Sequence, residues 1–232
     1  MLSLSLIALP LAGALAVAVA GDRRGWPGAA LGALATTAVL GTWSAAVESS
    51  ASLRWSDALD VTLSTTGFAR VMVVVVPAVA ACVVWWAVAE AAEHDLRRLA
   101  VGLLAFVGAM ELVVSAADLL ALLIGWELVA VASWVLISHD WRDAGKPRLA
   151  TEAFVTTRVG DLGLFVAAGA AVAGGAGVSL AYTDLASIDG TWLGVLAFGV
   201  LLAAAAKSAQ VPFSPWLFSA MAGPTPVSAL LH

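Results

Sequence analysis

The sequence predicts an all-α polytopic membrane protein with seven transmembrane helices and the start of an eighth. Of its 232 residues, 62% are hydrophobic and only 12% are charged, whereas a soluble domain carries about 25% charged residues. The mean hydropathy of +0.98 supports the same class. Apolar runs of about 20 residues, the length that crosses a bilayer as a helix, recur along the whole chain. No basic patch suggests nucleic acid as a partner.

Seven apolar runs are long enough to span the membrane. They cover residues 2–20, 28–47, 67–89, 97–116, 118–138, 152–174 and 192–210, and an eighth run begins near Pro226. The first run lacks a positive n-region, and its arginines come after it, which favours a retained helix over a cleaved signal peptide. The longer loop at 48–66 is expected to form either a short hairpin or an interfacial cap.

The positive charges of the loops predict the orientation of the chain in the membrane. The loops after spans one, three and five hold seven of the eleven lysines and arginines: Arg23, Arg24, Arg97, Arg98, Arg142, Lys146 and Arg148. The alternate loops hold only Arg54. Because positively charged loops stay in the cytoplasm, we expect the N-terminus to lie outside.

Two charged residues lie deep within the spans. Glu127 is near the middle of LLALLIGWELVAVASWVL, where an ionised carboxylate costs about 2.5–3.5 kcal/mol. Lys207 ends the seventh run, five residues before Pro212. A lysine beside a broken helix is typical of an ion path near the membrane midplane. The packing alternatives are a neutral glutamic acid bonded to another helix and a lysine that snorkels to the interface.

Four prolines lie near the end of the chain. They are Pro212, Pro215, Pro224 and Pro226. A proline donates no backbone N–H and its ring clashes with a preceding carbonyl, so we expect span seven to break just after Lys207. His232 then lies one to two turns into the last helix, and its imidazole suits a proton relay.

Three further charged residues of the spans are candidates for a role at the site. Arg158 and Asp161 are three residues apart in EAFVTTRVGDLGLF, so they share a helix face and are expected to form a local, supporting ion pair. Glu111 in the fourth run is a possible secondary proton site or a hydrogen-bonded packing residue. With one cysteine, Cys82, and three histidines, the sequence predicts no metal or redox centre.

Several of these segments resemble one family. GWELVAVASWVLI, EAFVTTRVGDLGLF, AKSAQVPFSPWL and AMAGPTPVSALLH are similar to motifs of the antiporter-like membrane subunits of respiratory complex I, a group that includes subunit L of bacterial NADH-quinone oxidoreductase and mitochondrial chain 5. The resemblance is strong over about 115–232. It implies that Glu127 modulates the lysine, that Lys207 is the central lysine of the broken helix, and that His232 begins a relay.

The resemblance also implies a setting for the chain. Its expected partners are the other membrane subunits of a complex I-type assembly and the lipid bilayer, in the inner membrane of a bacterial cell. The chain is expected to act as a membrane subunit of a proton-translocating NADH:quinone oxidoreductase, a translocase. NADH and quinone would be used by the whole complex, with no cofactor bound by this chain.

The resemblance divides the chain into two parts. Residues 1–96 hold transmembrane helices one to three, and residues 97–232 hold the first part of the antiporter-like repeat. In a two-repeat fold, this chain is expected to be an N-terminal fragment, truncated at His232. The alternatives are a subunit of a multisubunit sodium/proton antiporter or related ion-coupled complex, and a non-transporting structural remnant. The segment TTRVGDLGLF favours complex I.

Overall fold

The computed structural model describes residues 1–20, 25–56, 59–90, 95–175 and 180–232. Seven helices in this part of the chain are long and apolar enough to cross a membrane: α1 (Leu2–Val19), α2 (Trp26–Ala46), α3 (Ala69–Glu90), α4 (Leu96–Ser115), α5 (Leu119–Ile137), α6 (Gly145–Ala173) and α8 (Gly190–Lys207). The predicted seven spans are confirmed. Arg23 and Arg24, used to predict the orientation, lie outside the described residues.

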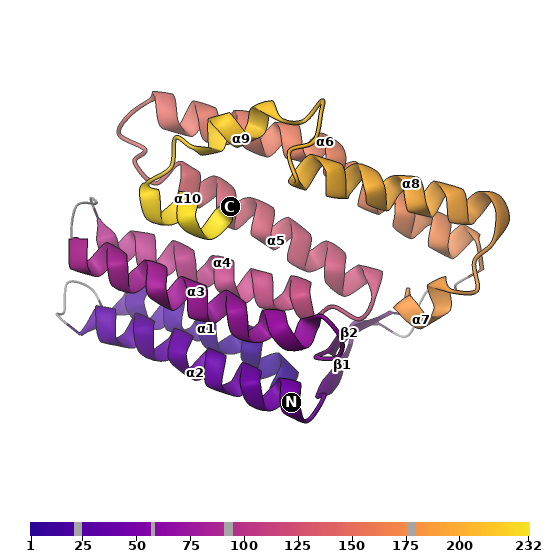
Figure 1. Ribbon diagram of the computed structural model, residues 1–232, viewed down its shortest axis with the longest axis horizontal. Coiled ribbons are helices and arrows are strands. Elements are labelled where there is room, and N and C mark those ends of the chain that lie inside the picture. Colours follow the sequence, from indigo (N-terminus) through magenta and orange to yellow (C-terminus); the bar gives the residue numbers. More distant parts are fainter. Residues whose placement is uncertain (21–24, 57–58, 91–94, 176–179) are drawn as a thin grey trace.

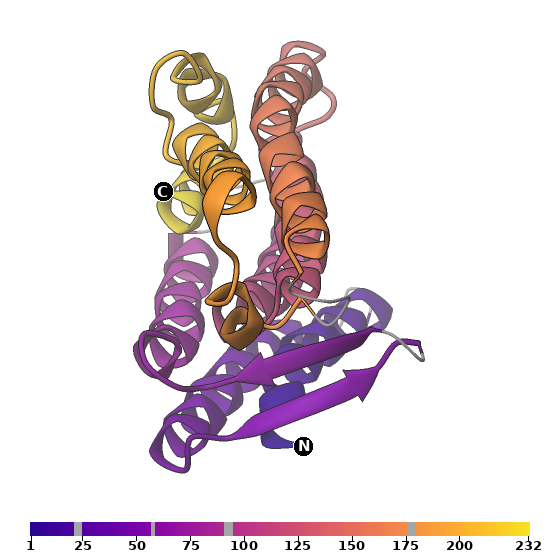
Figure 2. The same cartoon turned by 90° about the vertical axis from the view of Figure 1, so that its right-hand side faces the viewer.

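The first four helices form one bundle, and the remaining helices lie beside it (Figures 1 and 2). Helix α1 packs on α2 and α4, and α3 packs on α2 and α4. Their shared interior is built from apolar side chains such as Leu34, Ala80, Leu104 and Val107. Helix α4 also packs on α5, and α6 packs on both α5 and α8. Helix α6 therefore contacts the helices that carry Glu127 and Lys207.

The loop between α2 and α3 forms a β-hairpin. Its strands, β1 (Ser50–Arg54) and β2 (Asp60–Ser64), pair antiparallel with Ser50 opposite Ser64. Asp118 joins the hairpin to α5, because one carboxylate oxygen caps the helix by accepting Ala121 N–H at 2.6 Å and the other accepts Thr62 N–H. The hairpin and the short helix α7 (Tyr182–Leu185) lie at the same end of the molecule (Figure 1).

Helices α6 and α8 approach each other closely through small residues. A Cβ atom on Gly163 would lie 2.3 Å from the carbonyl oxygen of Gly199, and one on Gly160 would lie 2.0 Å from the Cβ of Ala206. Helix α6 also begins seven residues earlier than predicted, because Arg148 and Glu152 pair at 3.0 Å on its polar first turns. The start of the span was predicted from its apolar residues, and this pattern does not include a polar helical turn outside the bilayer.

Span seven breaks immediately after Lys207, as the fold prediction required. Ala209 adopts a left-handed backbone (φ +53°), Gln210 N–H donates to Ala205 O, and Ala209 N–H donates to Ala206 O. This pattern is a Schellman motif, which satisfies the last carbonyls of the helix. The chain resumes as α9 (Pro215–Ala220) and α10 (Thr225–Leu231). Pro215 and Pro226 occupy their first turns, where a missing N–H costs no helical bond.

Candidate functional site

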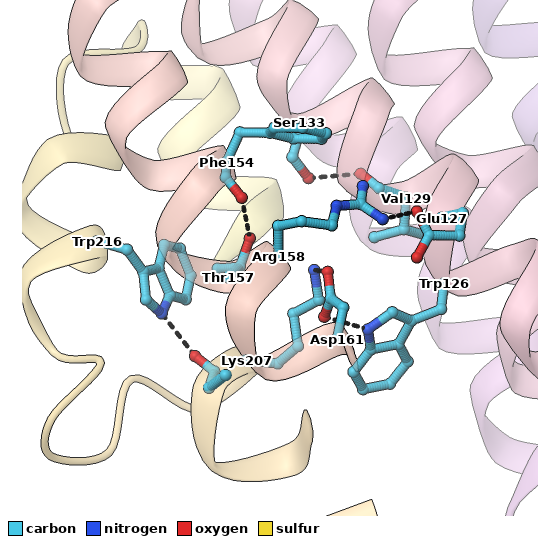
Figure 3. A network of polar contacts seen from close by, with 11 residues as sticks. Trp126, Glu127, Val129, Ser133, Phe154, Thr157, Arg158, Asp161, Lys207 and Trp216 are labelled. Carbon is cyan, nitrogen blue, oxygen red and sulfur yellow. Dashed lines mark hydrogen bonds and ion pairs between the residues drawn. The ribbon is translucent and has the colours of Figure 1, made fainter. Parts of the chain in front are cut away.

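Four charged residues from three membrane helices meet near the end of α8 (Figure 3). Glu127 comes from α5, Arg158 and Asp161 from α6, and Lys207 from the last position of α8. The Nη1 atom of Arg158 donates to Oε2 of Glu127. The Nζ atom of Lys207 lies 3.5 Å from Oδ2 of Asp161. The structure thus joins Glu127 and Lys207 into one polar region through two residues of α6.

The pairing within this region differs from the local pair that the sequence predicted. Arg158 and Asp161 do not pair with each other. Each binds a residue of opposite charge on a different helix. The reason lies in the position of α6, which packs on α5 and on α8. Each cross-helix contact pairs one charge of α6 with a charge of α5 or α8. A local pair between Arg158 and Asp161 would leave Glu127 and Lys207 buried without a partner, which is costly.

Burial differs between the two ion pairs. The side chain of Asp161 is 1% exposed, that of Lys207 is 25% exposed, and those of Glu127 and Arg158 are each 29% exposed. Among the atoms of the described chain, Oε1 of Glu127 and Oδ2 of Asp161 have no hydrogen-bond donor. Glu127 therefore retains an oxygen that can accept a proton while its other oxygen holds Arg158. In Asp161, the oxygen without a hydrogen bond is the one that faces Lys207.

Trp126 contacts both members of the ion pair between Asp161 and Lys207, the inner pair. Its indole N–H donates to Oδ1 of Asp161 at 2.6 Å, and its ring centroid lies 5.5 Å from the Nζ atom of Lys207. The ring face favours a cation, and the N–H favours a carboxylate. Trp126 therefore holds the pair in place. Trp126 directly precedes Glu127 but was not predicted from the sequence as a site residue.

Trp216 connects the C-terminal segment to the end of α8. Its indole N–H donates to the carbonyl oxygen of Ala206 at 2.7 Å, and its ring centroid lies 6.0 Å from that of His232. His232 is thus placed next to α9, with Trp216 between it and the residue before Lys207. Its predicted role as the start of a relay stays a prediction.

A cavity of about 230 Å³ borders Lys207. Helices α4, α5 and α6, together with Trp216 and Leu231, supply a mainly apolar lining. Ser133, Thr157 and Lys207 are its hydroxyl and charged groups. The ammonium group of Lys207 therefore borders an open space as well as its ion-pair partner.

Glu111 lies apart from these four charges, in the interior of the α1–α4 bundle, where it is fully buried. Across the described ranges, no group of three His, Cys, Asp or Glu side chains is placed to hold a metal ion. The four-residue region therefore offers charge and proton exchange, using carboxylates, a guanidinium and an amine.

Opposite charges that pair across membrane helices beside a broken span are typical of one class of protein, the ion-translocating membrane subunits. Comparison with known families gives the particular group. Residues 116–232 match the family described as NADH:quinone oxidoreductase/Mrp antiporter, TM. The match covers half of the chain, and the chain belongs to this family.

Relatives of known name agree with this assignment. NADH-quinone oxidoreductase subunit L of Mycobacterium tuberculosis is 32% identical over an alignment of 256 positions, which covers 98% of this chain and 39% of the relative. NADH-ubiquinone oxidoreductase chain 5 of Pongo abelii is 37% identical over 158 positions, covering 66% of this chain and 26% of the relative. This chain thus spans about two fifths of the length of the bacterial relative.

A solved structure shares the fold over the whole chain. The Mrp complex from Dietzia sp. DQ12-45-1b contains a chain that superimposes with a TM-score of 0.86 at 26% identity, covering 100% of this chain and 26% of the other. An archaeal membrane-bound sulfane sulfur reductase contains a chain with a TM-score of 0.81 at 16% identity. The second likeness concerns the fold alone.

Proposed function

We propose that this chain forms the proton-carrying half-channel of a membrane subunit in a complex I-type NADH:quinone oxidoreductase. The observation that carries the proposal is the pair of cross-helix contacts, Glu127 to Arg158 and Asp161 to Lys207, at the break of α8. The names of the relatives support this choice of assembly. In it, quinone reduction elsewhere in the complex drives proton transfer through the four residues.

Arg158 is the element that couples the two pairs. When Glu127 takes up a proton, its negative charge disappears and Arg158 loses its partner. Asp161, three residues further along the same helix, is then the nearest alternative acceptor. When Arg158 turns towards Asp161, its positive charge competes with that of Lys207, and Lys207 releases its proton.

The size of this coupling is sufficient for a switch. At an effective dielectric constant of about 20, two unit charges about 4 Å apart interact by about 4 kcal/mol. A change of about 1.4 kcal/mol alters a proton affinity tenfold. Even at twice this separation, the gain or loss of one neighbouring charge changes the occupancy of a proton site more than tenfold.

The assembly and location extend this proposal. The chain would bind other membrane subunits and lipid in the bacterial inner membrane. NADH and quinone would be used by other parts of the complex, with no redox group or metal in this chain. The N-terminus would face outside, because Arg97, Arg98 and Arg148 belong to the first turns of α4 and α6, at the end opposite the hairpin (Figure 1).

A sodium/proton antiporter subunit is the second candidate. The fold shared with a chain of the Dietzia Mrp complex favours it. The two candidates differ in the driving reaction. An antiporter exchanges protons for sodium without any redox partner, whereas the complex I subunit translocates protons only while quinone is reduced. A sodium gradient imposed on vesicles therefore separates them.

The test is proton translocation by the complete complex that contains this chain. Glu127→Gln and Lys207→Ala are each expected to lower proton translocation per quinone reduced at least tenfold. The matched control is Arg148→Gln, which removes one partner of an exposed pair on the same helix as Arg158. Normal translocation in both site variants would overturn the proposal and favour a structural remnant.

A further inference from the structure

Glu111 is a buried carboxyl that the proposed function does not use. Its residue exposure is 0%. Neither Oε1 nor Oε2 has a hydrogen-bond partner among the described residues. An acidic side chain that is fully buried without a partner is rare. The group therefore requires an explanation of its own.

The side chain points into the centre of the α1–α4 bundle. Leu104, Val107, Glu111 and Val114 follow a spacing of three, four and three residues, so they form one stripe of α4. Leu104 and Val107 pack with residues of α1, α2 and α3. Val114 packs with Leu6, Ala45 and Val73, again one residue from each of these helices. Glu111 lies between these two contact layers.

No cation faces Glu111 from the helices around it. Helices α1 and α2 contain no titratable residue. The charged residues of α3 lie at its ends: Arg70, which pairs with Glu48 at 2.7 Å, and Glu90. Arg97 and Arg98 lie in the first turn of α4, at the opposite end from Glu111.

Helix α5 also offers no compensating charge. Asp118 accepts two backbone N–H groups at its start, and Glu127 is paired with Arg158. An ionised carboxylate among apolar helices without a counter-ion is strongly disfavoured. Glu111 is therefore a protonated carboxylic acid in this surrounding, and a change in its charge requires a route for the proton.

A cluster of hydroxyl groups lies between this position and the hairpin. Ser49 Oγ is 2.7 Å from Ser3 Oγ and 2.5 Å from Ser44 Oγ, and Ser44 Oγ donates to Thr65 Oγ1 at 3.1 Å. Ser3, Ser44 and Thr65 are fully buried. Hydroxyl groups both donate and accept hydrogen bonds, so a connected set of them can pass a proton.

This hydroxyl cluster lies close to Glu111 along the bundle axis. Ala45, the neighbour of Ser44, packs with Val114, which is three residues beyond Glu111 and therefore about 4.5 Å further along α4. Ser115, one turn beyond Glu111, is also buried, and its hydroxyl donates to the backbone carbonyl oxygen of Glu111 at 2.5 Å. Buried hydroxyl groups thus occupy the end of the bundle between Glu111 and the hairpin.

We propose that Glu111 is a separate proton-binding site, whose proton exchanges with solvent from the hairpin side through the cluster of Ser3, Ser44, Ser49 and Thr65. It holds its proton as a neutral carboxylic acid. Each proton that leaves towards the hairpin, away from Glu127 and Lys207, is replaced by another, so that the group stays neutral. The site belongs to this chain alone and does not depend on the proposed function.

Infrared spectroscopy of the full chain in lipid vesicles tests this proposal. A protonated carboxylic acid gives a carbonyl stretching band that an ionised carboxylate and an amide lack. We expect this band at neutral pH in the unmodified chain and in Glu127→Gln, and its loss in Glu111→Gln. Transfer into heavy water at neutral pH should shift the band, because the acid proton exchanges with solvent.

The route is tested by two matched serine variants. Ser44→Ala should slow the heavy-water shift at least tenfold, whereas Ser133→Ala, on α5, should leave its rate unchanged. Three results would overturn the proposal: no band that depends on Glu111, a band that never shifts in heavy water, or equal exchange rates in Ser44→Ala and the unmodified chain. None of these measurements requires proton translocation, so failure here is distinguishable from failure of the proposed function.

Discussion

The two halves of this molecule treat buried charge in opposite ways. In the α1–α4 bundle, one carboxyl, Glu111, lies among apolar side chains and has no hydrogen-bond partner among the described residues. In the α5–α6–α8 region, two acidic and two basic side chains form two ion pairs across helices. The first arrangement stabilises one neutral form of a single group. The second offers alternative partners, so a proton added at one residue changes the balance at the others.

The difference shows which charges in a membrane helix can carry ions in concert. A buried carboxyl without a partner stays in one protonation state. Where ion pairs can exchange partners, the protonation state of one group affects those of the others. Helix contacts decide between the two cases. Tight packing of α6 on α8 through Gly160 and Gly163 brings Asp161 to Lys207, while the residues of α4 on either side of Glu111 pack with apolar residues of α1, α2 and α3.

The largest expected effect comes from breaking the inner ion pair. Lys207→Met leaves the carboxylate of Asp161, which is 1% exposed, without its cation. Removing one partner of a buried pair costs about 3–5 kcal/mol in the free energy of unfolding. The double variant Lys207→Met/Asp161→Asn removes both charges and should recover most of this loss. Denaturant unfolding in lipid nanodiscs measures both values, and equal stability of the single and double variants would contradict the pairing.

The next effect concerns the indole N–H of Trp126. Trp126→Phe keeps an aromatic ring near Lys207 but removes the hydrogen bond to Asp161. A hydrogen bond to a charged group contributes about 1.5–3 kcal/mol, and proton translocation should fall about tenfold. The control is Trp134→Phe, because the indole of Trp134 donates only to the exposed Thr151 hydroxyl at 3.2 Å. Equal losses in the two variants would mean that Trp126 acts only through packing.

A third test separates α6 from α8 without touching a charge. In Gly163→Ala, the new Cβ atom would meet the Gly199 carbonyl oxygen at 2.3 Å, and such overpacking costs about 1–3 kcal/mol. Gly169→Ala in the same helix adds the same atom where nothing lies within 4 Å. It should be neutral or stabilising by up to about 1 kcal/mol, because alanine favours the helix. A stable Gly163→Ala variant with normal translocation would show that close approach is unnecessary.

The smallest effect is expected in the bundle. Glu111→Gln replaces a neutral acid by a neutral amide of similar shape, so the free energy of unfolding at neutral pH should change by less than about 1 kcal/mol. A loss as large as that of Lys207→Met would indicate an ionised Glu111 with a counter-charge. Thermal unfolding of the two variants in the same lipid makes this comparison directly.

Sequence reasoning predicted the membrane helices well, because their length and apolar character follow from bilayer thickness. It left the hairpin open, since strand pairing and the hydrogen bond from Thr62 N–H to Asp118 depend on contacts between distant residues. The break after Lys207 was predicted from prolines. The structure makes the break at the predicted place, but through the left-handed backbone of Ala209, which precedes the first of these prolines, and no sequence rule favours alanine there.

The residues of the candidate site were predicted from the sequence, but the pairing of Arg158 with Asp161 was predicted wrongly. Charge within an apolar run was enough to select Glu127, Arg158, Asp161 and Lys207. The spacing rule that predicted a pair between Arg158 and Asp161 describes an isolated helix and contains no information on neighbouring helices. The roles of Trp126 and Trp216 were missed for the same reason, because tryptophan is common in membrane helices and only contacts distinguish these two.

The most direct test of the central claim is proton translocation by the complete complex carrying Lys207→Met/Asp161→Asn. This variant keeps neutral side chains of similar size, so a loss of function would not reflect an unpaired buried charge. We expect quinone reduction to continue while proton translocation per quinone falls at least tenfold. A ratio equal to that of the unmodified complex would contradict the account, because protons would then cross without Lys207 and Asp161.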